Sequence, residues 1–181
     1  MLLKIITVLF ILISFIHTGN TKEIEEYKIE LLTIGELDQK IRNEYTYWDD
    51  AIRIDKENLA KLKSLIKKYG FPTIPLVGKK AHQAAFLIAQ HAASDKKFML
   101  YFLNEMESRL GSMEITDQYY AYLLDRTNLM SDLKQIYGTQ GNCINGIYEV
   151  TNIKDPIKLP QLRKEIGLLT LTEFSKAVCV E

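Results

Sequence analysis

Two charged residues interrupt apolar helical faces of the sequence, and a charge in such a place needs a partner. In residues 21–45, apolar side chains recur every three or four positions, and Asp38 lies within about 20° of the centre of that stripe. In residues 116–133, Arg126 lies within about 20° of the centre of a similar stripe. Because burying an unpaired charge is costly, we expect Asp38 and Arg126 to meet, directly or through a ligand.

Arg42 lies one helical turn beyond Asp38 and can pair either with Asp38 or with Asp125. Two interpretations of these charges stay open. The first is a buried ion pair that only fixes how the helices pack. The second is a pocket whose charged floor binds a polar or anionic ligand. Both interpretations assume that these residues face the core. A third is that the predicted helical phase is wrong, since element boundaries read from one sequence shift by several residues.

The histidines point to at most one acid–base group. His91 shares an apolar face with Ala84 and Ile88, so it is either a hydrogen-bonded core residue or a general acid or base near neutral pH. Gln90 points away from it and would serve another surface. His82 and His91 lie about 180° apart around a helix and cannot share one ion. With two cysteines and these histidines there is no zinc-type spacing, so we expect neither a metal nor a cofactor.

The run Tyr137-Gly138-Thr139-Gln140-Gly141-Asn142 is dense in hydrogen-bonding groups and flexible backbone. Such a loop can line a site, or it can simply lead into a hairpin. The chain has no phosphate-binding loop and no Gly-x-Ser-x-Gly elbow. Without an evident nucleophile, the sequence leaves open whether the protein is an enzyme.

The elements that must position these residues are mostly helices. Asp55 and Asp95 are suitable helix caps, and Gly70 is a suitable helix end. Pro72 and Pro75 favour an extended stretch after Gly70. The predicted main helices cover residues 21–45, 55–69, 79–93, 95–110 and 116–133.

After the fifth helix the pattern changes. Asn145-Gly146 between two short β-type runs predicts a hairpin. Pro160 suits the first turn of a short helix, and Thr170 with Glu173 forms a capping-box pattern for the last one. The expected fold is mostly α: a single-domain helical bundle of about five main helices, with a small C-terminal β-hairpin and short helices.

Length and composition fit one ordinary domain over residues 20–181. The chain has 181 residues, 47% of them hydrophobic, which is enough for a core and argues against disorder. Its 23 basic and 23 acidic residues give no net charge, so a nucleic-acid partner is not expected.

Residues 1–19 have the layout of a secretory signal peptide: Lys4, an apolar run over residues 5–16, then small and polar residues. We expect an exported protein, periplasmic or extracellular, with no membrane contact after signal removal. An uncleaved N-terminal anchor is the alternative. In an oxidising compartment Cys143 and Cys179 can form a disulfide, or they can be two separate small buried residues.

Six motifs follow one another along the chain. They are Leu37-Asp38-Gln39-Lys40-Ile41-Arg42, Gly70-Phe71-Pro72-Thr73 with Val77-Gly78, Ala84-Ala85-Phe86-Leu87-Ile88-Ala89-Gln90-His91-Ala92, Asp125-Arg126, Gln135-Ile136-Tyr137-Gly138-Thr139-Gln140, and Arg163 to Leu168 with its Arg-x-x-x-Gly-Leu pattern.

Together these motifs resemble a bacterial family of uncharacterised exported helical domains, marked by Gln-His-Ala, Asp-Arg and Tyr-Gly-Thr-Gln. The likeness covers about residues 30–175 and departs at Ala93-Ser94, where the family pattern usually has an acid. The resemblance implies a shared fold but no reaction or substrate. It also implies a shared set of motif residues, namely Asp38, Arg42, Gln90, His91, Asp125, Arg126 and Tyr137 to Gln140.

These observations favour an exported binding module whose polar pocket holds a small polar ligand or a protein. The ligand-binding residues we expect are Asp38, Arg42, Gln90, His91, Asp125, Arg126, Tyr137, Thr139 and Gln140. The alternative is a hydrolase acting on envelope or extracellular material, with His91 as general base and Arg126 or the Thr139-Gln140 pair stabilising negative charge. A third possibility is that the motif residues only hold helices together.

Overall fold

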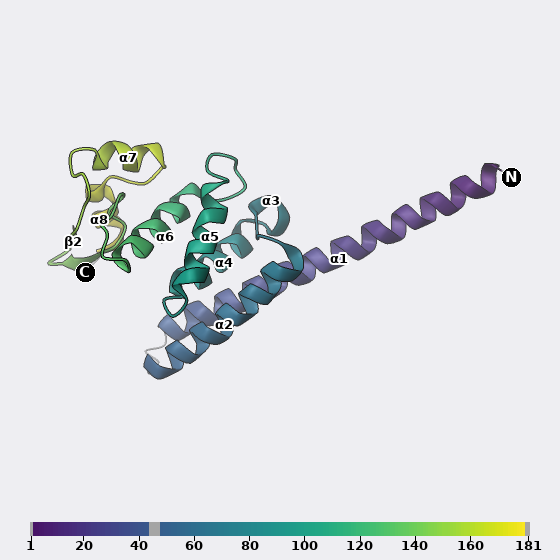
Figure 1. Cartoon of the computed structure of the whole chain (residues 1–181), viewed down its shortest axis with the longest axis horizontal. Coiled ribbons are helices and arrows are strands. Elements are labelled where there is room, and N and C mark those ends of the chain that lie inside the picture. The colour runs from purple at the N-terminus through teal and green to yellow at the C-terminus, as the bar shows by residue number, and fades with distance from the viewer. Residues whose placement is uncertain (1, 44–47, 180–181) are drawn as a thin grey trace. The chain divides into compact units, whose positions relative to one another are not determined.

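Helices make up most of the structure, as the sequence predicts (Figure 1). The structure is a computed structural model that describes residues 2–43 and 48–179. A single two-stranded hairpin interrupts the helical pattern in this part of the chain. In chain order the elements are α1 (Leu2–Asn43), α2 (Trp48–Tyr69), α3 (Ile74–Val77), α4 (Lys79–His91), α5 (Lys96–Glu107), α6 (Asp117–Leu129), β1 (Gly141–Ile144), β2 (Ile147–Val150), α7 (Leu159–Glu165) and α8 (Leu171–Val178).

The chain divides into two compact units, Met1–Ile88 and Ala89–Glu181. Within the described part, no helix combines the length and the apolar character needed to cross a membrane. The predicted signal peptide over residues 1–19 and the single domain over residues 20–181 stay predictions.

In the first unit, α1 and α2 pack side by side in opposite directions. The hydroxyl of Tyr27 donates to the carbonyl of Gly70 (2.9 Å), and the amide of Asn58 donates to the carbonyl of Ile34 (3.3 Å). The predicted stripe on α1 is the buried face, on which Asp38 is fully buried. The helix continues to Asn43, and residues 44–45 of the predicted helix lie outside the described residues.

Gly35 sets how closely α4 approaches α1. A Cβ atom at Gly35 would lie 2.5 Å from the Cβ of Ala84. A side chain at Gly35 would therefore push the two helices apart. A hollow of about 410 Å³ opens beside this contact.

Two predicted boundaries in this unit are wrong. Asp55 does not cap the second helix, because α2 already begins at Trp48 and Asp55 instead pairs with Arg42 (2.8 Å). The stretch after Pro72 is not wholly extended, because Pro75 lies in the first turn of the short helix α3, a position that needs no N–H donor.

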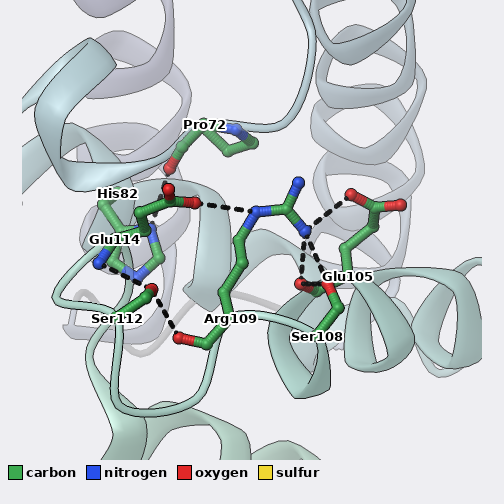
Figure 2. A network of polar contacts seen from close by, with 7 residues as sticks. All are labelled: Pro72, His82, Glu105, Ser108, Arg109, Ser112 and Glu114. Atoms are coloured by element: carbon green, nitrogen blue, oxygen red, sulfur yellow. Dashed lines mark hydrogen bonds and ion pairs between the residues drawn. The ribbon is translucent and has the colours of Figure 1, made fainter.

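In the second unit, α5 packs against α6. Asp95 caps α5 as predicted, accepting a hydrogen bond from the backbone N–H of Phe98 (2.9 Å). The loop between the two helices is held by Arg109, which pairs with Glu105 (3.0 Å) and Glu114 (3.2 Å) (Figure 2). The hydroxyl of Ser112 also donates to the carbonyl of Arg109 (2.6 Å).

The phase predicted for α6 is wrong, although the helix itself is present. It ends at Leu129, four residues earlier than predicted, and Leu133 is exposed. Arg126 is only half-buried, whereas its neighbour Asp125 is fully buried. The acid, and not the arginine, is therefore the buried charge of this helix.

The C-terminal elements match their local signals. Strands β1 and β2 pair antiparallel around Asn145-Gly146, both with positive φ. Pro160 lies in the first turn of α7, and Thr170 and Glu173 form both bonds of the capping box of α8. A disulfide joins Cys143 to Cys179, with their Cα atoms 5.5 Å apart.

His82 is a fully buried titratable group in the first unit. Its Nδ1 lies 2.8 Å from the carbonyl oxygen of Pro72 (Figure 2), so Nδ1 carries the proton. Burial lowers the pKa of His82 below 6.5, and the hydrogen bond to Pro72 opposes this only in part. The unfolded chain therefore binds a proton at His82 more readily than the folded chain does.

We predict that the free energy of unfolding falls as the pH drops below about 6.5 and levels off below the folded-state pKa of His82. In His82→Asn, which keeps a donor for Pro72, the fall between pH 6.5 and about 5 should be shallower. Urea unfolding of wild type and of His82→Asn at several pH values measures both slopes. Equal slopes would contradict the prediction.

Candidate functional site

In the first unit, Asp38 lies in a chain of charges. Its Oδ1 pairs with Nη1 of Arg42 (2.9 Å), and its Oδ2 accepts a hydrogen bond from the side chain of Gln39 (2.7 Å). Arg42 also pairs with Asp55 (2.8 Å). The side chain of Asp38 is 1% exposed and that of Arg42 is 28% exposed. Arg42 therefore links the buried acid to solvent, and its pairing with Asp38 is one of the two pairings that the sequence predicts.

Asp38 belongs to the first unit and Arg126 to the second, and the positions of the units relative to one another are not determined. A direct contact between Asp38 and Arg126 therefore stays a prediction.

In the second unit, the carboxylate of Asp125 binds the backbone of the loop over residues 136–139. Oδ1 accepts from the N–H of Ile136 (2.6 Å) and of Tyr137 (3.1 Å). Oδ2 accepts from the N–H of Thr139 (2.9 Å) and from its hydroxyl (3.0 Å). Because these donors surround both oxygens, Asp125 positions the loop and is not available to bind a ligand directly.

Gln135 is a second buried support of the same loop. Its amide nitrogen donates to the carbonyls of Gln140 (2.8 Å) and Thr151 (2.9 Å), and its amide oxygen accepts from the N–H of Gln140 (2.9 Å). The side chain thus mimics a backbone strand partner and closes the loop between Gln135 and Gln140.

Arg163, only 2% exposed, supports the loop from its carbonyl side. Nη1 donates to the carbonyls of Tyr137 (2.7 Å) and Gly138 (3.1 Å), and Nε donates to that of Leu169 (2.7 Å). Within the described chain no carboxylate lies within ion-pair distance of Arg163. The sequence signals were the motifs containing Gln135 and Arg163, but nothing in them shows which backbone groups they bind.

A second cluster in this unit is formed by Arg126 with Gln140 and Gln90. Nε of Arg126 donates to the side-chain oxygen of Gln140 (3.2 Å), and Nη1 donates to the backbone carbonyl of Gln90 (3.4 Å). The side-chain oxygen of Gln90 is buried and has no hydrogen-bond partner in the described chain. A buried acceptor without a donor costs about 1–3 kcal/mol.

The remaining predicted residues lie in different surroundings. Thr139 is buried, and its hydroxyl binds Asp125. Tyr137 is half-buried, and burial, followed by the nearby charge of Asp125, raises the pKa of its phenol. His91 is half-buried at the last position of α4. The structure thus brings together Asp125, Arg126, Tyr137, Thr139, Gln140 and Gln90 within one unit.

No group of three or more His, Cys, Asp or Glu side chains suited to a metal ion occurs among the described residues. The guanidinium of Arg126 and the side-chain amides of Gln90 and Gln140 have the chemistry of hydrogen bonding to a polar or anionic group.

Residues 25–179 match a family described as "Family of unknown function (DUF6624)". No curated protein and no solved structure shows significant similarity to the chain.

We predict that Asp125→Asn lowers the free energy of unfolding by at least about 3 kcal/mol, because an amide nitrogen would face N–H groups that need acceptors. Asp132→Asn is the matched control, since Asp132 is exposed with a positive φ that Asn tolerates. Chemical denaturation of both variants beside wild type measures the difference. A loss below about 1 kcal/mol would mean that the carboxylate is not essential to the loop.

Proposed function

The chain belongs to the DUF6624 family of unknown function, and we propose that it is an exported binding module that takes a small polar ligand at Gln90, Arg126 and Gln140. The proposal concerns the second unit, which contains all three residues. Its ligand carries a hydrogen-bond donor for Gln90 and a carboxylate or other acceptor for Arg126.

The observation that carries the proposal is the unpartnered side-chain oxygen of Gln90. Buried polar atoms in native proteins nearly always have partners, so an exception needs an explanation. A ligand hydroxyl, amine or amide would supply the donor that Gln90 lacks. Functional sites are where proteins keep such locally unfavourable groups.

Arg126 is the reason to expect a carboxylate or other acceptor on the ligand. Its guanidinium reaches both the backbone of Gln90 and the side chain of Gln140, at 3.4 and 3.2 Å. A guanidinium carries five N–H donors, and the bonds to Gln90 and Gln140 are at the long end of hydrogen-bond distances. A carboxylate would form shorter, charge-assisted bonds with a guanidinium.

The support of the loop is the third argument. Asp125, Gln135 and Arg163 are buried polar side chains that all bind the backbone of one short loop. A binding site needs contact residues held in place by surrounding hydrogen bonds, because pre-organisation reduces the entropy lost on binding. This arrangement would hold Gln140 in position opposite Arg126.

Export rests on the sequence of residues 1–19, and the Cys143–Cys179 disulfide supports it because such bonds persist in oxidising compartments. A hydrolase with His91 as general base is the alternative. Such an enzyme would convert its ligand, whereas a binding module would return it unchanged.

We predict that Gln90→Met stabilises the protein by about 1 kcal/mol, because it removes a buried acceptor without a donor and nearly keeps the side-chain volume. The same variant should lose the thermal shift that a panel of hydroxy acids, amino acids and acidic sugars produces with wild type. Gln161→Met is the matched control, since Gln161 is exposed on α7 and donates a hydrogen bond to Glu165 (2.8 Å).

Arg126→Lys and Gln140→Ala complete the test. Both should lose the ligand-induced shift while keeping the unfolding free energy within about 1 kcal/mol of wild type, since the side chain of Gln140 makes only long contacts. Mass spectrometry of recovered ligand separates binding from hydrolysis. If no panel member shifts wild type and Gln90→Met is destabilised, the binding proposal fails.

A further inference from the structure

We infer that the redox state of the Cys143–Cys179 disulfide controls how firmly the loop over residues 136–139, and Gln140 directly after it, is held in place. Reduction would detach α8 from the hairpin and loosen one side of the loop, while the rest of the second unit stays folded. An effect of reduction on ligand affinity rests on the proposed function. The effect of reduction on the loop itself does not depend on it.

A disulfide, a hydrogen bond and a ring contact attach helix α8 to the rest of the second unit. The disulfide joins Cys179, just after α8, to Cys143 in β1. The hydroxyl of Ser175 accepts a hydrogen bond from the backbone N–H of Tyr148 in β2 (2.8 Å). The ring of Phe174 meets that of Tyr148 edge-on, with centroids 4.9 Å apart. A helix of eight residues is not stable by itself, so these contacts determine whether α8 stays in place.

The same contacts lead to the loop. The hydroxyl of Tyr148 donates to the carbonyl of Thr139 (2.8 Å), which lies in the loop. The guanidinium of Arg163, which holds the carbonyls of Tyr137 and Gly138, lies 5.7 Å from the ring centroid of Phe174. Losing α8 would therefore remove the contact of Phe174 with Arg163 and the contacts of Phe174 and Ser175 with Tyr148. Arg163 and Tyr148 are the residues whose side chains bind the loop carbonyls.

The N–H groups of the loop are bound by side chains that lie outside α8. Asp125 and Gln135 hold its N–H groups from α6 and from the segment that follows it. Helix α6 in turn packs against α5, which has a buried apolar face of its own. We therefore expect reduction to have a local effect and not to unfold the unit.

The disulfide is accessible to a reductant. All four residues of β1, including Cys143, are exposed, and Cys179 is only partly buried. A dithiol can attack one sulfur as its thiolate and form a mixed disulfide. Its second thiol then displaces the protein thiol. The dithiol gives up two electrons and two protons and becomes a cyclic disulfide, and Cys143 and Cys179 become thiols.

The experiment is hydrogen exchange on the full chain, folded, with and without dithiothreitol, followed residue by residue by NMR. Reduction should speed exchange about tenfold or more at the N–H of Tyr148, which loses its bond to Ser175. The N–H groups of Thr139 and Gln140 should exchange faster by a similar factor, because a loop that has lost support at its carbonyls opens more often. The N–H groups of Phe102 and Leu103, buried in α5, should change by less than about twofold. Because this readout needs no ligand, its failure is distinguishable from failure of the proposed binding site.

The double variant Cys143→Ser/Cys179→Ser is the matched control, since it should show the fast loop exchange without dithiothreitol and no response to it. Two results would overturn the inference. One is unchanged exchange at Thr139 and Gln140 after complete reduction, which would make α8 irrelevant to the loop. The other is equal acceleration in the loop and in α5, which would make the disulfide a stabiliser of the whole unit.

Discussion

The carboxylate of Asp125 is the interaction on which the second unit depends most. It is fully buried on α6, and its two oxygens accept hydrogen bonds from three backbone N–H groups and one hydroxyl of the 136–139 loop. An isolated buried carboxylate is strongly unfavourable. Here the hydrogen bonds from the loop offset the cost of burial. Separating the loop from α6 would leave the carboxylate either exposed or buried without partners. This fixes the loop relative to α6, and with it Gln140 relative to Arg126.

Three other side chains, those of Gln135, Arg163 and Tyr148, also bind the backbone of this loop. Acceptors on Asp125 and Gln135 satisfy the loop's N–H groups, and donors on Arg163 and Tyr148 satisfy its carbonyls. An irregular loop has backbone groups with no regular partner, and buried ones must be satisfied by side chains. Four side chains from different parts of the unit perform this role.

The first unit uses a buried acid differently. Asp38 lies on the apolar face of α1, but its partner Arg42 comes from the next turn of the same helix and continues to Asp55 on α2. This chain of charges connects two helices rather than a loop. It also reaches the surface, because Arg42 is partly exposed. The motif residues thus support two separate units, and the cluster around Arg126 contains the side-chain oxygen of Gln90, a buried atom without a hydrogen-bond partner in the described chain.

The sequence by itself determined the features that depend on short-range interactions. These are the mostly helical class, the α5 cap at Asp95, the hairpin turn at Asn145-Gly146 and the capping box of α8. Each of these depends on residues within four positions of one another. The stripe with Asp38 was also predictable, because α1 buries one face from Tyr27 to Ile41. The phase of α6 was not. Its burial is set from two sides, by α5 and by the loop that Asp125 binds, so it does not follow one helical stripe. For the same reason only the tertiary structure showed that Arg163 binds the carbonyls of Tyr137 and Gly138, about 25 residues away in the chain, since a contact at that separation depends on how the intervening elements pack.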